Sequence, residues 1–587
     1  MIQTADIFVI AYIALPLLLG LFLLVFSRIL RRWAFGLTLS VTSVLFVATV
    51  VCWSSGWMYQ HAGLLLDGTT RVMLVWTSFF AWILSMYAKG YFPSTEESTP
   101  FYALSLMSLG VTFFTFLADH MILLAIGWGI LGVLLYAMIG LKKGSDIRDA
   151  AKKTFIMVGG SDIVMILGLV LLYFLTDTML FSTMSVTLDM PLASLSLVFL
   201  FTGAFAKAGV FPFHSWLPDA CQHSYVPVTA FLPLSLDKLL GVYLMIRMIG
   251  SIYTINAITS IIIMSIGCIT IFVGVLMALV QHDLKRLLGY HTVSQVGYMV
   301  LGIGTGTMIG MVGAVYHMIN NTVYKTLLFI SCGMVEKSCK TTDLDRLGGL
   351  AKVLPITFTV MAIASLSISG VFPFNGYFSK HVIMHGIEVT HELFHISWWP
   401  VFWILAFIGS LLTLSSFVKV IYALFVEKPC QCWKHIQENN GWMLVPMLLL
   451  AVLCILLGVT AEGWTNTSFL VPIFNKETHI HFNMLEGWMY LLGFSILIAV
   501  FIGSITRYAK RCNVQGIKCY EKLRNCIGLK KAYDCAEKKY LDVYDLGKRM
   551  ILSTSSLLRS AHSGLLPTYA FWFVLGTLLF ALYYFTV

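Results

Sequence analysis

Apolar runs of about 20 residues recur along the whole chain and alternate with short polar segments. A helix needs about 20 apolar residues to cross the roughly 30 Å of hydrocarbon in a bilayer. The runs of this length predict sixteen membrane-spanning helices, near residues 7–30, 34–53, 69–88, 100–117, 120–141, 154–176, 194–212, 226–249, 255–280, 288–304, 307–331, 353–375, 400–426, 443–462, 485–506 and 567–586. We therefore expect an all-α integral membrane protein with about sixteen transmembrane helices.

The composition supports this expectation. Hydrophobic residues make up 58% of the 587 residues and charged residues only 11%, which is far from the balance of a soluble domain. The net charge of +10 requires no nucleic acid partner, because membrane proteins collect lysine and arginine in their cytoplasmic connections.

The basic residues indicate an orientation. They gather in the connections 27–33, 141–153, 281–288 and 335–347 and in the segment 507–550. An even number of spans places both termini on one side, so these connections predict a multi-pass protein of the bacterial inner membrane with both termini on the outer side. The first apolar run follows no basic stretch and carries no small-residue cleavage site, so we interpret it as a retained helix rather than a signal peptide.

Two patterns bear on metal binding, and neither predicts a metal site. The twelve cysteines form no C-x-x-C pair, so reduced thiols are the plain interpretation. The sequence HELFH at 391–395 matches the H-E-x-x-H pattern of zinc peptidases, but that chemistry needs a third ligand and a cleft. It falls in a predicted outer connection, and we interpret it as a solvated interfacial loop.

Ionisable residues occur where lipid would otherwise surround the chain. They are Asp162, Lys207, Asp237, Lys238, His317, Lys325 and Lys380. Because a charge at the bilayer centre costs several kcal/mol, such residues normally face the protein interior or water and mark ion paths. The alternative is a residue near a helix end whose head group reaches the interface, which is a serious alternative for Lys325 and a lesser one for Lys380. The set as a whole predicts an internal polar pathway.

The pentapeptide GVFPF occurs twice, at 209–213 and 370–374, each time near a lysine. Pro212 and Pro373 remove a backbone hydrogen bond, and Gly209 and Gly370 relax the chain beside them. Transporters use paired discontinuous helices in corresponding positions of two repeats to build ion sites. The two segments therefore predict matching broken helices, with two unrelated kinks as the alternative.

Four stretches resemble a known family. They are AKAGVFPFHSWLPDACQHSYVPVTAF at 206–231, LVQHDLKRLLGYHTVSQVGYMVLGIG at 279–304, YHMINNTVYKTLLF at 316–329 and SGVFPFNGYFSK at 369–380. They are similar to the proton-conducting antiporter-like subunits of respiratory complex I, membrane-bound hydrogenases and Mrp-type antiporters. The resemblance extends from about residue 65 to the C-terminus.

The resemblance implies an architecture. The sixteen spans and the tail are similar to the largest antiporter-like subunit of complex I, in which a lateral helix runs along the membrane surface to an anchoring last span. Residues 528–562, basic and partly apolar, suit such an interfacial helix. The implied segments are N-terminal helices at 1–99, two inverted antiporter-like repeats at 100–249 and 250–426, additional spans at 427–506, and a basic segment, lateral helix and anchor at 507–587.

The resemblance also implies residue roles. Lys207 matches the central lysine of the first broken helix, Lys238 lies at or beside a connecting lysine, and Asp237 precedes it. His317 matches a bridging histidine, Lys325 a lysine further along the same helix, and Lys380 the terminal lysine on the second broken helix. Asp162 matches an acidic position on the sixth helix.

Three positions depart from the family pattern. Gly129 stands where the fifth helix usually carries a glutamate that partners the central lysine, and Asp162 is the nearest candidate to replace it. His381 follows Lys380 where an acid is common, and Asn321 occupies a site often held by a second histidine. A histidine titrates near neutral pH, so His381 could relay a proton at the outlet.

These observations favour a proton-translocating membrane subunit of a redox-driven complex, similar to an NADH-quinone oxidoreductase or a membrane-bound hydrogenase. The alternative is an ion-coupling subunit of a complex without redox chemistry, as in Mrp-type exchange or inorganic-carbon uptake; a third interpretation is a membrane scaffold with no working path. No cofactor fingerprint occurs, so redox chemistry would belong to partner membrane subunits, clamped by the lateral helix. Protons are the expected cargo, with sodium ions as the alternative, and the chain is expected to be a non-catalytic subunit of a translocase complex.

Overall fold

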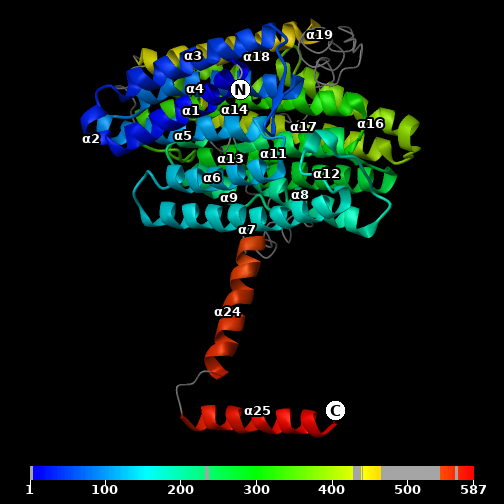
Figure 1. Ribbon diagram of the computed structural model, residues 1–587. Coiled ribbons are helices and arrows are strands. Elements are labelled where there is room, and N and C mark those ends of the chain that lie inside the picture. Colours follow the sequence, from blue (N-terminus) through cyan, green and yellow to red (C-terminus); the bar gives the residue numbers. More distant parts are fainter. Residues whose placement is uncertain are drawn as a thin grey trace, which may run out of the picture. The chain divides into compact units, whose positions relative to one another are not determined.

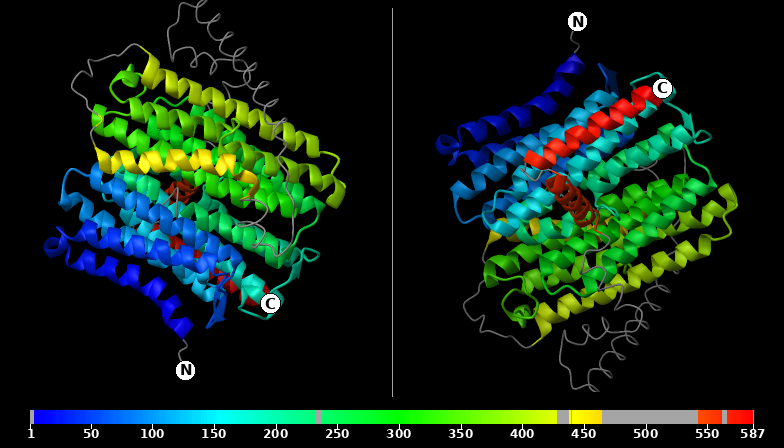
Figure 2. Two further views of the ribbon diagram at one scale, coloured as in Figure 1. Left: turned by 90° about the horizontal axis from the view of Figure 1, so that it is seen from above. Right: turned by 90° about the horizontal axis from the view of Figure 1, so that it is seen from below.

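A computed structural model describes residues 4–231, 237–427, 438, 440–463, 542–561 and 566–586. The chain divides into two compact units, Met1–Cys526 and Ile527–Val587. The first unit is a bundle of helices that lie side by side, with the N-terminal helices along one edge and the helices near residues 400–425 along the opposite edge (Figures 1 and 2).

The helices of the first unit are, in chain order, α1 Thr4–Val25, α2 Ser27–Leu30, α3 Ala34–Ser54, α4 Gly68–Tyr91, α5 Thr95–Leu117, α6 Met121–Ile139, α7 Ser145–Thr176, α8 Pro191–Ala208, α9 Trp216–His223, α10 Val226–Phe231, α11 Asp237–Arg247, α12 Ala257–Leu279, α13 Leu284–Gly304, α14 Met308–Cys339, α15 Pro355–Ser369, α16 Asn375–Phe394, α17 Trp399–Ile421, α18 Gly441–Val459 and α19 Ala461–Gly463. Short 3₁₀ helices occur at η1 Phe181–Thr183 and η4 Leu350–Lys352, and π-helical turns at η3 Met248–Ile252 and η5 Tyr422–Val426. Two small ribbons complete the unit: β1 Tyr59–His61 pairs antiparallel with β2 Leu64–Leu66, and β3 Val186–Thr187 pairs parallel with β4 Tyr253–Thr254.

Eleven of the described helices are long and apolar enough to cross a membrane: α1, α3 to α8, α12, α17 with η5, α18 and α25 Leu566–Thr586. The predicted spans at 288–304 and 307–331 also form helices, α13 and α14, but their polar side chains keep them outside this set. The predicted span at 485–506 lies outside the described residues. The all-helical membrane fold is confirmed, and the count of sixteen spans stays a prediction.

Two predicted spans, 194–212 and 353–375, extend too far. Helix α8 ends at Ala208 and α15 ends at Ser369, because the next residue in each case is a glycine in the left-handed conformation. Gly209 has φ of +79° and Gly370 has φ of +76°, a conformation that glycine adopts without steric cost. The Phe211–Pro212 and Phe372–Pro373 peptide bonds that follow are both cis. The next helices, α9 and α16, begin only at Trp216 and Asn375, so the helical backbone is interrupted at both GVFPF segments.

Short polar side chains start several helices. The side chain of Asp67 accepts a hydrogen bond from the backbone N–H of Thr70 at 2.8 Å, before α4, and that of Asp283 accepts one from Arg286 at 2.9 Å, before α13. These caps satisfy N–H groups that the first turn of a helix leaves without partners.

Helices α13 and α14 form the buried centre of the bundle. Nearly every residue of α13 is buried, and α14 is buried continuously from Gly310 to Val335. Their neighbours include α12, α9 and α16. Because these two helices contact protein all around, their polar residues can face other side chains instead of lipid.

Basic connections from distant parts of the chain meet at one end of the bundle. Lys285 donates to the carbonyl of Ser224 at 2.6 Å and pairs with Glu336 at 3.3 Å. Asp219 pairs with both Lys153, at 3.0 Å, and Arg286, at 3.6 Å. The connections 141–153, 281–288 and 335–347, which the sequence predicts on one side of the membrane, therefore border one another through these contacts.

The second unit contains two described helices, α24 Val543–Ala561 and α25. Helix α24 carries Val543, Leu546 and Met550 at spacings of three and four, with Leu557 two turns further on and charged residues such as Lys548 between them. It covers part of the predicted interfacial helix at 528–562, and residues 528–541 lie outside the described chain.

Close packing of α12 against α13 depends on facing glycines. A Cβ at Gly297 would lie 2.7 Å from the carbonyl oxygen of Gly267, and one at Gly267 would lie 2.7 Å from the backbone nitrogen of Leu301. We expect Gly297→Ala to lower the free energy of unfolding by about 1–3 kcal/mol, the usual cost of overpacking. Thermal unfolding of the detergent-purified protein measures this effect.

Gly36→Ala is the matched control, because a Cβ at that helical position meets nothing within 4 Å. Equal unfolding midpoints for the two variants would contradict the proposed tight contact.

Candidate functional site

Five of the ionisable residues selected from the sequence are buried in the first unit. Their side chains come from four helices, and none is more than 7% exposed: Asp162, Lys207, His317, Lys325 and Lys380. Asp237 and Lys238 begin α11, but their side chains lie outside the described part. The structure therefore places these five side chains inside the protein, where snorkelling to the interface does not explain them.

The first group surrounds Trp128 on α6. The ammonium of Lys207 donates to the backbone carbonyl of Trp128 at 2.8 Å and lies 4.5 Å from the centre of its ring. The indole N–H of Trp128 donates to Oδ1 of Asp162 at 2.8 Å. One tryptophan therefore contacts both the lysine of α8 and the carboxylate of α7, with no direct ion pair between them among the described contacts.

Gly129, where the family resemblance predicts a glutamate, is exposed on α6. A Cβ at this position would meet nothing within 4 Å. A Cβ at Gly132, one turn further on, would lie 3.5 Å from Oδ2 of Asp162. The carboxylate of Asp162 thus lies behind α6, inside the bundle, whereas position 129 faces its surface.

The second group lies along α13. The ammonium of Lys325, on α14, donates to the carbonyl of Leu288 at 2.8 Å. The ammonium of Lys380, on α16, lies 4.6 Å from the ring centre of Tyr298, ten residues after Leu288. The two lysines therefore contact the same helix, about 15 Å apart along its axis.

The second helix break supplies the acceptor for Lys380. Its ammonium donates to the carbonyl of Ile368 at 2.9 Å. Ile368 belongs to the last turn of α15, and because the helix ends before Gly370 its carbonyl has no N–H from a following helical turn. A Cβ at Gly370 would lie 3.1 Å from Cδ of Lys380, so the glycine also leaves room for the lysine side chain.

The first break is used differently. The carbonyl of Ala206, near the end of α8, accepts a hydrogen bond from the indole of Trp216 at 2.9 Å. Lys207 points instead to α6. Each break thus leaves a main-chain carbonyl that accepts a side-chain hydrogen bond, but the donor is a lysine only at the second break.

His317 and His381 occupy different surroundings. His317 shares a hydrogen bond of 2.9 Å with Ser379, the neighbour of Lys380, and its ring centre lies 5.6 Å from that of Tyr298. His381 is half-buried and stacks on Tyr377 at 5.8 Å. The structure therefore joins His317 to the surroundings of Lys380, and it places His381 on an adjoining face of α16.

The chain resembles known proteins over this region. The family described as NADH:quinone oxidoreductase/Mrp antiporter, TM matches residues 118–413, which is half of the chain. The chain belongs to this family. The resemblance inferred from the sequence is thereby confirmed, and the match covers both helix breaks.

Relatives of this antiporter-family chain include the A1 protein of a Na(+)/H(+) antiporter of Staphylococcus epidermidis, which is 31% identical over 487 residues, covering 76% of this chain and 60% of the relative. The corresponding Na(+)/H(+) antiporter protein of Bacillus subtilis is 31% identical over 398 residues, covering 64% of this chain and 49% of the relative. The chain thus spans 60% or less of the length of these two relatives.

Solved structures share the fold of this antiporter-family chain. A chain of the membrane-bound sulfane sulfur reductase, an archaeal respiratory membrane complex, superposes with a TM-score of 0.78 at 22% identity, covering 98% of this chain and 100% of that one. A chain of the Mrp complex from Dietzia sp. DQ12-45-1b gives 0.72 at 18% identity, covering 81% and 98%. Respiratory complex I from Thermus thermophilus gives 0.65 at 21% identity, covering 78% and 98%.

Several buried or half-buried polar residues of this antiporter-family protein were not predicted from the sequence. Trp128, Tyr298 and His291 all contact the lysine groups or lie between them, but each looks like an ordinary apolar or helical residue in the sequence. Asp219 and Glu336, which pair with Lys153 and Lys285, carried a usable signal, because each is an acid beside a predicted span.

The HELFH sequence forms the last turn of α16 and its cap, so the predicted loop is wrong: the helix continues to Phe394. His391 and His395 are exposed. Among the described residues, no group of three metal-binding side chains occurs.

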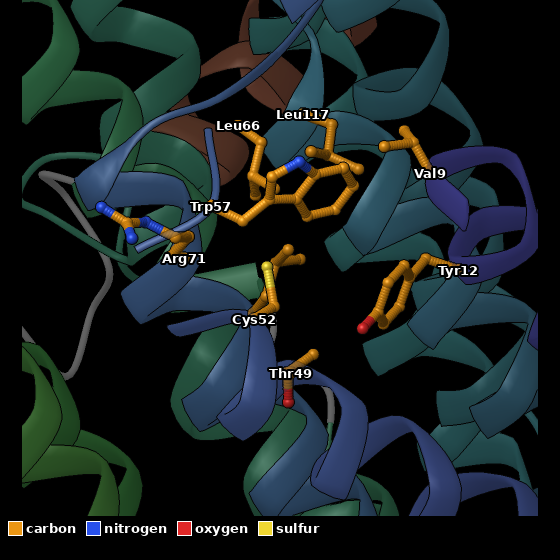
Figure 3. A pocket seen from close by; sticks show the side chains of 9 residues that line it. Val9, Tyr12, Thr49, Cys52, Trp57, Leu66, Arg71 and Leu117 are labelled. Atoms are coloured by element: carbon orange, nitrogen blue, oxygen red, sulfur yellow. The ribbon is translucent and has the colours of Figure 1, made fainter. Parts of the chain in front are cut away.

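A small pocket lies among the N-terminal helices, apart from the lysine groups (Figure 3). Tyr12, Cys52, Trp57 and Arg71 contribute to its lining. None of its nine lining residues is a carboxylate or histidine, so its chemistry does not match that of the buried lysines.

The contact of Trp128 with Asp162 can be tested alone. Trp128→Phe keeps a ring beside Lys207 but removes the N–H that Asp162 accepts. Since a buried acceptor then loses its donor, we expect the free energy of unfolding to fall by about 1–3 kcal/mol. Unfolding of the detergent-purified protein measures the change, and Trp398→Phe, at a 70% exposed tryptophan, is the control. An equal shift in both variants would argue against the contact.

Proposed function

We propose that this chain is a proton-translocating subunit of a multisubunit membrane complex. The observation that carries the proposal is that the three buried lysines selected from the sequence all donate to main-chain carbonyls: Lys207, Lys325 and Lys380. Among the described residues, no carboxylate pairs directly with Lys207 or Lys380. Lys207 and Lys380 can therefore lose a proton without leaving a paired carboxylate alone in the protein interior.

The proposed path begins at Lys207, with Asp162 acting on it through Trp128. It continues through Lys238 and its neighbour Asp237 to Lys325, and then past His317 to Lys380, with His381 at the outlet. The breaks at Gly209 and Pro212 and at Gly370 and Pro373 would supply free carbonyls and room for water. Protons are the proposed cargo of this path, with sodium ions as the alternative.

The energy source separates two versions of this function. A redox-driven complex is the main one, supported by the likeness to a respiratory membrane complex over 98% of this chain. Mrp-type cation exchange is the second, supported by relatives named as Na(+)/H(+) antiporter subunits. Neighbouring genes for redox subunits would favour the first, and genes for small antiporter subunits the second.

The architecture of the proposed subunit follows the sequence segments. N-terminal helices at 1–99 precede inverted repeats at 100–249 and 250–426, each with one broken helix, and further spans occupy 427–506. Sixteen spans in all, with the basic connections on the cytoplasmic side, would place both termini outside. No cofactor is expected in this chain.

Lys380 provides the test of proton relay. Lys380→Ala removes the carrier, and Lys380→Arg keeps a charge that cannot be given up, because arginine is not deprotonated in proteins. We expect both variants to reduce ion translocation at least tenfold in proteoliposomes that contain the complete complex at wild-type subunit content.

Lys152→Arg is the matched control, since the Lys152 side chain is 62% exposed. Near-normal transport by Lys380→Arg would identify a fixed charge and overturn the relay.

The C-terminal residues 507–587 are proposed to hold a partner subunit through a lateral helix and an anchoring span. Helix α24 is amphipathic, and α25 is apolar with no buried residue in the described chain, so both offer surfaces that lipid or protein can cover. We expect deletion of 528–587 to release the partner on detergent extraction, as measured by co-purification. Intact and active complex after the deletion would refute the clamp.

A further inference from the structure

One face of α13 connects the surroundings of Lys325 with those of Lys380. Leu288, His291, Gln295 and Tyr298 follow one another at spacings of three and four residues, which places them on one side of the helix. Lys325 binds the carbonyl at the start of this face, and Lys380 lies over the ring at its end. The first polar side chain on this face after Leu288 is the imidazole of His291.

His291 is completely buried and has one hydrogen-bonded nitrogen. Its Nε2 shares a hydrogen bond of 2.7 Å with Oγ of Ser416 on α17, and its ring lies 4.6 Å from that of Phe417. Its Nδ1 has no hydrogen-bond partner among the described residues. Nδ1 is therefore available to gain or lose a proton.

Further polar atoms continue from His291 along the same interval. Oγ of Ser294, Nε2 of Gln295 and both amide atoms of Asn321 are buried without a partner among the described residues. Buried polar groups of this kind are normally satisfied by ordered water. They therefore mark a place where water can bridge His291 to its neighbours.

Lysines lie on both sides of His291 along this face. Lys325 donates to the carbonyl of Leu288, three residues before His291, and Lys380 lies over the ring of Tyr298, seven residues after it. A third lysine, Lys419, follows Ser416 by three residues on α17. Lys419 itself donates to the carbonyls of Leu279 and Gln281, at 2.8 and 2.9 Å. Like charges repel, so a proton added to His291 is accommodated better once a neighbouring lysine has become neutral.

We propose that His291 is a proton-carrying station between Lys325 and Lys380. The proton leaves the ammonium of Lys325, which becomes a neutral amine, and binds the unprotonated ring nitrogen to form an imidazolium. The imidazolium then releases one proton to the neutral amine of Lys380, and the neutral ring is restored. This inference rests on the proposed proton-translocating function and adds a residue to its path.

The decisive comparison is between His291→Gln and Ser416→Ala. Glutamine can keep a hydrogen bond to Ser416 but cannot carry a proton, whereas Ser416→Ala removes the hydrogen bond and keeps the imidazole. We expect His291→Gln to lower proton translocation at least tenfold and Ser416→Ala to lower it less than threefold, in proteoliposomes of the complete complex normalised to subunit content. A purely structural histidine predicts the reverse order.

His385→Gln, at a half-exposed histidine that pairs with Glu388, is the control for the substitution itself and should transport normally. His291→Asn, smaller than the imidazole, is the second variant if His291→Gln assembles poorly. Near-normal transport by either His291 variant overturns this proposal.

Lys380→Ala, measured in the same vesicles, separates the two hypotheses. If it abolishes transport while His291→Gln transports normally, only the role of His291 fails. If it transports normally, the proposed function itself fails.

Discussion

An ammonium group inside an apolar bundle needs an oxygen acceptor, and main-chain carbonyls provide it at all three buried lysines of the proposed path. Lys207 binds the carbonyl of Trp128, Lys325 that of Leu288 and Lys380 that of Ile368. A carbonyl stabilises the ammonium group without neutralising its charge, so the lysine can still lose its proton. Helices α6, α13 and α15 carry these carbonyl oxygens, so their packing determines where each ammonium group is stabilised.

The two GVFPF segments show how identical sequence can serve different contacts. At each, a glycine with positive φ ends the helix and leaves a carbonyl without its usual partner. Trp216 occupies the carbonyl at the first break, and Lys380 occupies the one at the second. The difference follows from position, because Lys207 precedes its break whereas Lys380 follows its own by several residues. Lys207 is therefore directed across the bundle to α6, and Lys380 is directed back to the helix before its break.

Trp128 connects the two charged residues of the first group, Lys207 and Asp162. It contacts Lys207 through its carbonyl and ring and Asp162 through its indole. The carboxylate and the ammonium can influence each other through this residue without forming a contact ion pair. Such an arrangement avoids the strong fixation of a buried salt bridge, in which removal of either charge is costly.

The sequence by itself was sufficient for the membrane fold, the family, the approximate positions of most of the long described helices and the helix breaks. Each of these depends on local properties: the length of an apolar run, or a glycine and proline at fixed spacing. It also identified Lys207, Lys325 and Lys380, because a charge within an apolar run stands out, although it did not select the buried Lys153, Lys285 and Lys419. It did not identify Trp128, Tyr298 or His291, and it placed the HELFH residues in a loop although α16 extends through them. Only the tertiary structure decided which carbonyl each lysine binds, that position 129 faces the surface and that α13 lies between Lys325 and Lys380. Those facts depend on contacts between residues 12 to 79 positions apart, which helix packing sets and no local pattern records.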